Sequence, residues 1–225
     1  MALALQAFYQ ARKDANTEGV YITQLRADLD ANVSALQQAI GEENARLAAN
    51  GSMIASLYQR QPLSPDSASR WLHWQLGYYT DPRPVLATVT TLIETGDIKL
   101  IRDAALRSHI VAYASLMTTD LEEVARNVTR LTGANDAERR QWEKLNIPPL
   151  VNPRSTAATA ARLPGKYADD EVASFMPSYL KAWPILRADG ELRAAYQVRL
   201  IALANRVFYL ERMLKSTEEL RALLK

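Results

Sequence analysis

TLIETGDIKLIRDAALRSHIVAYA, residues 91–114, contains a helix end, a short connector and the start of a long helix. Gly96 predicts the end of the first helix, because glycine readily adopts the left-handed conformation that follows many helix C-termini. Residues 97–101 alternate polar and apolar side chains, but the sequence offers no second strand to pair with them. We therefore expect an extended or single-turn connector that buries Ile98, Leu100 or Ile101, followed by a helix that Asp103 caps.

The composition of the 225 residues favours helix and excludes several kinds of site. Glycine is scarce, and the helix-favouring residues Ala, Leu, Arg, Glu and Gln dominate. The absence of cysteine excludes disulfides and thiolate zinc sites, and two histidines make a histidine-rich metal site improbable. A formal net charge of +2 gives no global field that would attract nucleic acid. We expect no cofactor, no metal and no nucleic-acid partner.

Three long segments carry apolar residues at spacings of three, four and seven, which is typical of helices that pack along their length. They cover residues 17–60, 103–132 and 191–224. Helices this long need partners of similar length. The sequence therefore predicts an all-α fold: an elongated antiparallel bundle of three long helices with several short ones, in a single domain over residues 17–225.

Glycines and prolines divide the rest of the chain into shorter elements. Gly41 and Gly51 permit a bend or break in the first long helix, and Gly133 is expected to end the second. Pro177 and Pro184 predict a kink, or two short pieces, in the helix before the last one. The remaining predicted segments are short helices at 66–79, 84–93 and 137–145 and a long proline-rich loop at 146–169.

A ligand-binding site is conceivable between the aromatic helix at 66–79 and the connector at 97–107. Its candidate residues are Trp71, Trp74, Tyr78, Arg102 and Arg107. Aromatic rings offer stacking surfaces, and arginines beside a helix N-terminus attract an anion. The alternative is structural: aromatic residues at helical spacing often form a core, and Arg107 follows Asp103 at the spacing of a surface ion pair. The sequence leaves both interpretations open.

The first 16 residues are mostly apolar up to Tyr9 and then polar. Such a stretch is shorter than the roughly 20 residues that span a bilayer. It fits the frayed start of an amphipathic helix. It also fits the end of a membrane anchor whose front part is missing before Met1, with Phe8 and Tyr9 at the interface and Arg12 and Lys13 beyond it.

Three segments resemble an uncharacterised family of bacterial single-span membrane proteins. They read Leu92-x-x-Thr95-Gly96-x-Ile98-x-Leu100-Ile101-x-Asp103-x-x-Leu106-Arg107, Glu18-x-x-Tyr21-Ile22-x-x-Leu25-x-x-Asp28-Leu29 and Asn205-Arg206-x-x-x-Leu210. The resemblance implies an N-terminal anchor followed by a helical domain. It also implies a bacterial inner-membrane location with the helical domain in the periplasm. It carries no catalytic residues over to this chain.

No motif for catalysis is recognisable in the sequence. There is no glycine-rich phosphate loop, nucleophile elbow or HExxH helix. We therefore expect a non-enzymatic, membrane-tethered helical interaction module that pairs with itself or with a partner helical protein. The alternative is a sensor domain that binds a small molecule in the pocket described above.

Overall fold

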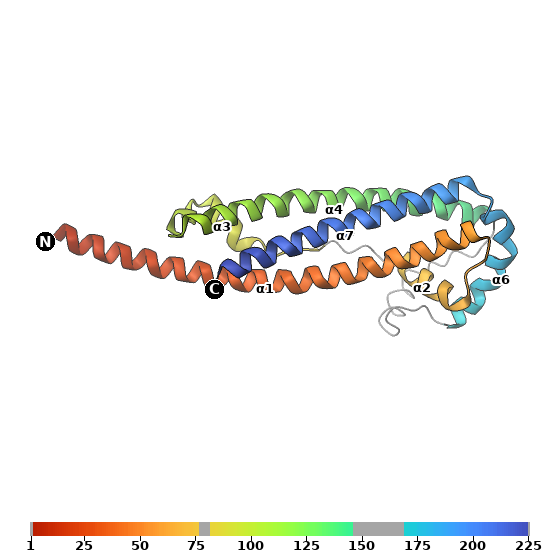
Figure 1. The fold of residues 1–225 in the computed structure, drawn as a ribbon, viewed down its shortest axis with the longest axis horizontal. Coiled ribbons are helices and arrows are strands. Elements are labelled where there is room, and N and C mark those ends of the chain that lie inside the picture. The colour runs from red at the N-terminus through yellow and green to blue at the C-terminus, as the bar shows by residue number, and fades with distance from the viewer. Residues whose placement is uncertain (1, 77–81, 146–168, 225) are drawn as a thin grey trace. The chain divides into compact units, whose positions relative to one another are not determined.

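The structure is a computed structural model that describes residues 2–76, 82–145 and 169–224, and it is helical almost throughout these ranges (Figure 1). No strand occurs among the described residues, which confirms the predicted all-α fold class. The elements are α1 (Ala2–Gln59), α2 (Pro65–Leu76), α3 (Ala87–Glu94), the 3-10 helix η1 (Asp97–Leu100), α4 (Ala104–Lys144), α6 (Asp169–Leu186) and α7 (Gly190–Leu223).

The helices group into two compact units, and each of the three long helices contributes residues to both. Unit 1 consists of Met1–Ile40, Pro82–Glu123 and Tyr209–Lys225, and unit 2 of Gly41–Asp81 and Val124–Phe208. Residues 2–16, predicted as the end of an anchor, form the start of α1. The division into an anchor end and one helical domain stays a prediction.

In unit 1, polar contacts fix the direction of each long helix. They pair Arg221 with Asp30, the carbonyl of Leu224 with Arg26, Arg212 with Asp120, and Thr217 with Tyr113. Residues later in α7 therefore contact residues earlier in α1 and earlier in α4. Within this unit α7 is antiparallel to both neighbours, and α1 and α4 run parallel to each other.

Unit 2 shows the same directions. Its polar contacts pair Glu43 with Arg206, Asn50 with the carbonyl of Tyr196, the carbonyl of Val124 with Arg206, and Glu138 with Arg199. Here too α7 is antiparallel to α1 and α4. The predicted antiparallel packing thus describes α7 against its two neighbours.

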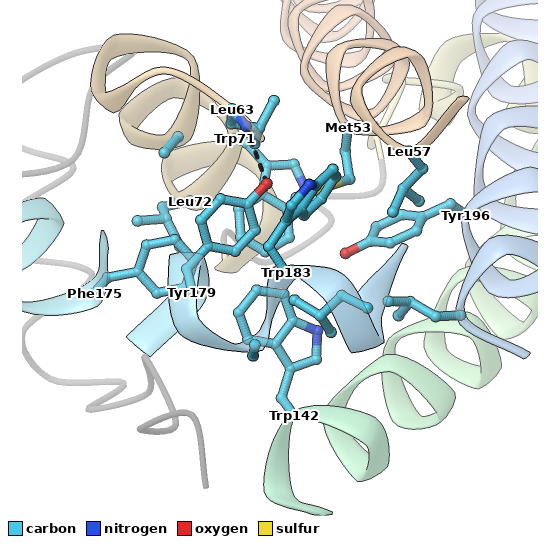
Figure 2. Packing of buried hydrophobic residues seen from close by; sticks show 14 of the residues in the cluster. Met53, Leu57, Leu63, Trp71, Leu72, Trp142, Phe175, Tyr179, Trp183 and Tyr196 are labelled. Atoms are coloured by element: carbon cyan, nitrogen blue, oxygen red, sulfur yellow. Dashed lines mark hydrogen bonds between the residues drawn. The ribbon is translucent and has the colours of Figure 1, made fainter. Parts of the chain in front are cut away.

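An aromatic core fills the part of unit 2 where α2, α4 and α6 meet (Figure 2). The ring centroids of Trp71 and Trp142 lie 5.3 Å apart, and Phe175 stacks on Trp142 at 5.5 Å. The Tyr179 ring continues the stack, and its hydroxyl accepts a hydrogen bond from the Leu63 amide at 3.0 Å. Aromatic rings contribute large buried areas, so this cluster holds the short helices α2 and α6 against each other.

The connector in the stretch 91–114 forms as predicted. Gly96 follows α3 with a φ of 74°, in the left-handed region where glycine avoids the strain of a side chain. The next residues make one turn of 3-10 helix, and Ile101 is fully buried after it. The Asp103 carboxylate accepts hydrogen bonds from the amides of Ala105 and Leu106 and so caps α4.

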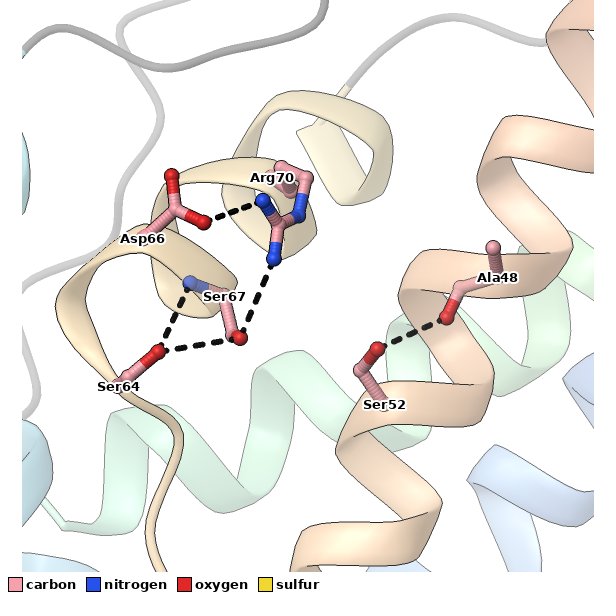
Figure 3. A network of polar contacts seen from close by, with 6 residues as sticks. All are labelled: Ala48, Ser52, Ser64, Asp66, Ser67 and Arg70. Carbon is pink, nitrogen blue, oxygen red and sulfur yellow. Dashed lines mark hydrogen bonds and ion pairs between the residues drawn. The ribbon is translucent and has the colours of Figure 1, made fainter.

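A serine caps the N-terminus of α2 (Figure 3). The Ser64 hydroxyl accepts a hydrogen bond from the Ser67 amide at 3.3 Å, and Pro65 occupies the first helical position. Arg70 pairs with Asp66 one turn away. The described part of the helix ends at Leu76, and the rest of the predicted segment lies outside the described residues.

The start of α3 differs from the prediction. The helix begins at Ala87 rather than at Pro84. The reason lies in α1: Asp28 accepts a hydrogen bond from the Thr88 amide at 3.3 Å, and Asn32 binds the main chain of Val85. These long-range contacts hold the chain before Ala87 out of the helix and satisfy the Thr88 amide of its first turn.

The predicted helix end at Gly133 is wrong. α4 continues through Gly133 to Lys144, so the separate helix predicted at 137–145 is the last part of α4. Gly133 is exposed, and its effect is limited to the lower helix propensity of glycine compared with alanine. The buried stripe continues past it through Ala134, Glu138 and Trp142, and these tertiary contacts outweigh the weak local preference.

The other predicted interruptions do not divide helices either. α1 passes without a break through Gly41 and Gly51, and α6 is one helix that contains Pro177 and Pro184. The predicted loop at 146–169 lies outside the described residues except for Asp169, where α6 begins.

Candidate functional site

The five predicted site residues fall in different parts of the chain. Trp71 and Trp74 lie on α2 in unit 2, whereas Arg102 and Arg107 belong to unit 1. Tyr78 lies outside the described residues. The pocket predicted between the aromatic helix and the connector therefore stays a prediction, and the two groups are described separately.

Trp71 is a core residue, as the structural interpretation of the aromatic helix proposed. Its side chain is 2% exposed, and it packs within the aromatic core of unit 2. Trp74 is half-buried, and the guanidinium of Arg46 lies 5.6 Å from the centre of its ring. That distance is within the range of a cation–π contact.

A small cavity lies beside these two tryptophans in unit 2. Its lining includes Arg46, Asn50, Trp71, Trp74 and Arg199, and its volume is about 10 Å³. A cavity of about 10–15 Å³ has room for one water molecule. The indole N–H of Trp71 and the side-chain carbonyl of Asn50 have no hydrogen-bond partner among the described residues. A cavity of this volume is too small for a metabolite.

Two buried ion-pair clusters lie between the long helices of unit 2. In the first, the Arg206 guanidinium, fully buried on α7, binds Glu43 of α1 at 2.9 Å and the Val124 carbonyl of α4 at 3.2 Å. Arg46 lies 3.8 Å from the same carboxylate. A buried guanidinium requires such partners, because an uncompensated charge in the protein interior is strongly destabilising. This cluster ties three helices together at one level.

The second cluster joins α4 and α7 and lies closer to the end of α4 and to the start of α7. Glu138 of α4 accepts hydrogen bonds from Arg199 and from the Tyr196 hydroxyl, and Asn135 accepts from Arg199 at 2.7 Å. Burial raises the pKa of the Tyr196 phenol well above its ordinary value, and the neighbouring Glu138 carboxylate raises it further. The phenol therefore stays protonated and serves as a donor. The arrangement pairs the buried Arg199 guanidinium with the Glu138 carboxylate.

In unit 1, Arg102 and Arg107 bind groups of the protein itself. The Arg102 amide donates to Glu18 of α1 at 2.7 Å, and its guanidinium lies 3.4 Å from the same carboxylate. Arg107 donates to the carbonyl of Ile101 at 2.5 Å and to that of Arg102 at 3.2 Å. The predicted surface ion pair of Arg107 with Asp103 is thus replaced by bonds to the connector. Both arginines stabilise the junction between η1 and α4.

Arg107 also lines a groove on unit 1. The groove has a volume of about 500 Å³, and its lining consists of Ile98, Arg107, Ser108, Val111, Ala112 and Ser115. Sites for small molecules commonly have volumes of about 300–1,000 Å³. The groove lies on the η1 and α4 side chains alone, and its polar groups are the guanidinium and two serine hydroxyls.

The side chains near the start of α1 are more exposed than those farther along the helix. Every residue from Phe8 to Lys13 is exposed. The rings of Phe8 and Tyr9 are each 62% exposed and meet edge to face, with centroids 6.2 Å apart. Arg12 and Lys13 follow one turn later. The Arg102 guanidinium donates to the Ala11 carbonyl at 3.5 Å, but no side chain from Phe8 to Lys13 is buried. Such a segment lacks the apolar packing that gives most helices their stability.

Three aspartates of unit 1 have structural partners. Asp28 caps α3, and Asp30 pairs with Arg221 at 2.6 Å. Asp120, fully buried, binds Arg212. Within the described ranges, no three His, Cys, Asp or Glu residues come together as metal ligands would.

Sequence reasoning missed the buried ionic residues Glu43, Glu138, Arg199 and Arg206. A signal for the two arginines was present, because they lie on the same stripe of α7 as the buried residues Tyr196, Leu203 and Leu210. Charged residues that occupy core positions of a helix imply a buried partner. The partners themselves come from helices far away in the sequence.

None of the described helices combines the length and the apolar character that a membrane-spanning segment requires. Comparison of the chain with models of protein families, with curated proteins and with solved structures finds no match. The resemblance to bacterial single-span membrane proteins therefore stays a prediction.

Proposed function

We propose that this chain is a non-enzymatic helical interaction module that is tethered to a membrane at the start of α1. The observation that carries the proposal is the exposure of Phe8 and Tyr9 on the helical segment 8–13, in which every side chain is exposed. Such aromatic side chains are typical of the boundary between bilayer and water, and cations such as Arg12 and Lys13 favour the headgroup side.

The interior of the bundle supports a structural role rather than a catalytic one. The buried carboxylates Glu43, Glu138 and Asp120 each bind an arginine. General acid–base catalysis needs a titratable group that faces a substrate cavity. The cavity beside Trp71 has room for about one water molecule, so it supports neither an enzyme nor a sensor for metabolites.

The long helices suit a protein that works through contacts with other proteins. Their charged residues hold the helices together from within, and the outer face of α7 in unit 2 presents Val198, Ile201 and Phe208 to solvent. Exposed apolar side chains gathered on one face are typical of an interaction surface. The proposed partner is a second copy of the chain or another helical protein. We place the module at a bacterial inner membrane with its helical part in the periplasm, as the sequence resemblance implies.

Flotation with lipid vesicles tests the tether. The chain is expected to float with vesicles of phosphatidylglycerol and phosphatidylcholine in equal parts. The double variant Phe8→Ser, Tyr9→Ser is expected to lower the bound fraction about tenfold or more, because burial of each aromatic side chain contributes about 1.5–3 kcal/mol. Arg12→Gln with Lys13→Gln should reduce binding to these vesicles but not to vesicles of phosphatidylcholine alone.

Tyr58→Ser is the matched control, because Tyr58 is exposed to a similar extent, 59% against 62% for Tyr9, at the other end of α1. It is expected to float like the unchanged chain. Equal flotation of all variants, or no flotation of the unchanged chain, would contradict a tether at this segment. Circular dichroism checks that each variant keeps its helix content.

A further inference from the structure

The outer face of α7 in unit 2 is uncharged over four turns. Between Ala194 and Phe208 the only charged residues are Arg199 and Arg206, and these are 1% and 0% exposed. Over the same stretch Val198 is 45% exposed, Ile201 59% and Phe208 56%. A helix on the surface of a soluble protein normally shows the opposite pattern, with charges outside and apolar residues inside.

The exposed residues follow the spacing of a helix–helix seam. Ala194, Gln197, Ile201, Ala204 and Phe208 are separated by three, four, three and four residues, and all five are exposed. This is the repeat of the a and d positions in a coiled coil, where each side chain packs between residues of a partner helix. The seam therefore fits a helix that lies along α7.

The side chains of this seam, together with the neighbouring Val198 and Asn205, are self-complementary about Ile201. In an antiparallel pair of identical helices centred on Ile201, residues whose numbers lie equally far above and below 201 face each other. Three such pairs arise: Ala194 opposite Phe208, Val198 opposite Ala204, and Gln197 opposite Asn205. Val198 and Phe208 thus each meet alanine, and Ile201 meets its own copy on the axis. The Gln197 amide, which donates to the Tyr58 hydroxyl at 2.6 Å within the chain, meets the Asn205 amide of the other copy, with which it can also exchange hydrogen bonds.

We propose that two copies of the chain associate through this seam, with the two α7 helices antiparallel and a two-fold axis at Ile201. A two-fold interface brings the same surface of both copies together, so it requires the self-complementarity seen here. A parallel pair would instead place Phe208 against Phe208 and Ala194 against Ala194, which crowds one end and leaves a gap at the other. The inference rests on the proposed function, because it specifies one of the protein contacts of the module.

The expected dimer is weak. Standard interfaces bury about 800 Å² on each partner, and smaller ones belong to transient complexes. The seam offers one helix face with three large apolar side chains, Val198, Ile201 and Phe208. We therefore expect a dimer that dissociates on dilution.

Single-cysteine crosslinking tests this geometry, because the chain contains no cysteine of its own. Under mild oxidation Ile201→Cys is expected to form a disulfide between two copies. A mixture of Ala194→Cys and Phe208→Cys is expected to give the mixed disulfide, while neither variant crosslinks to itself. Antiparallel helices separate two copies of the same residue by about 21 Å when it lies seven residues from the axis, at 1.5 Å of rise per residue. The pair Val198→Cys and Ala204→Cys repeats the test with smaller changes.

Ile185→Cys on α6 is the matched control, because Ile185 is 57% exposed in the same unit. Crosslinking of Ile201→Cys no faster than that of Ile185→Cys would overturn the proposal. Self-crosslinking of Ala194→Cys and of Phe208→Cys without the mixed product would overturn the antiparallel arrangement. Flotation of the same variants with vesicles separates the two proposals. If the variants float but Ile201→Cys does not crosslink, the membrane tether of the proposed function stands and the dimer is rejected.

Discussion

At the scale of single residues, the buried arginines of α7 show what periodicity can and cannot predict. Arg199 and Arg206 occupy the same stripe as buried Tyr196 and Leu203, so their spacing predicts that they share one face of α7 with these residues. Their partners Glu43 and Glu138 could not be derived, because they lie on other helices and the register between helices is set by tertiary packing. The sequence indicated that aromatic residues such as Trp71 could form a core. It did not indicate which other residues complete that core, because they come from α4 and α6.

Removal of one buried arginine is expected to be costly. Arg206→Met should lower the free energy of unfolding by about 3–5 kcal/mol, because it leaves the Glu43 carboxylate buried without its closest cation. Urea denaturation followed by circular dichroism measures the change. The matched control is Arg139→Met, because the Arg139 side chain is 61% exposed and forms its ion pairs at the surface. Its free energy of unfolding is expected to change by no more than about 0.5 kcal/mol. Similar losses for both variants would contradict the role given to the buried cluster.

At the scale of helices, the ends that were predicted correctly are those determined by local chemistry. Gly96 ends α3 through its backbone conformation, and Asp103 begins α4 through a side-chain cap. The incorrectly predicted boundaries were decided by distant residues. α4 continues through Gly133 because its buried stripe continues, and α3 begins at Ala87 because α1 supplies the capping carboxylate.

Two glycine substitutions distinguish a glycine that ends a helix from one that lies within a helix. Gly133→Ala is expected to raise the free energy of unfolding by about 0.5–1 kcal/mol, because alanine favours helix and a Cβ there meets no neighbouring atom. Gly96→Ala should lower it by about 1–2 kcal/mol, because its φ of 74° strains any residue with a side chain. Both values come from thermal or urea unfolding. A destabilised Gly133→Ala variant would mean that α4 is interrupted there.

At the scale of the whole molecule, α7 carries two stripes with helical spacing, and sequence alone does not say which of them packs within the chain. One stripe, through Tyr196, Leu203 and Leu210, is buried; the other, through Ile201 and Phe208, is exposed. Periodicity detects both equally, since it reports spacing and not the partner. The structure distinguishes them, and the exposed one becomes the surface through which we expect the module to act.

The central claim is that the chain works through contacts of its exposed helix faces, and sedimentation equilibrium over a concentration series tests it most directly. The unchanged chain and the control Ile185→Glu are expected to form dimers that dissociate on dilution. Ile201→Glu, at a site of similar exposure, is expected to remain monomeric with the same helix content, because a charge at the axis meets its own copy. An unchanged chain that is monomeric at every concentration, or a dimer that survives Ile201→Glu, would contradict the account.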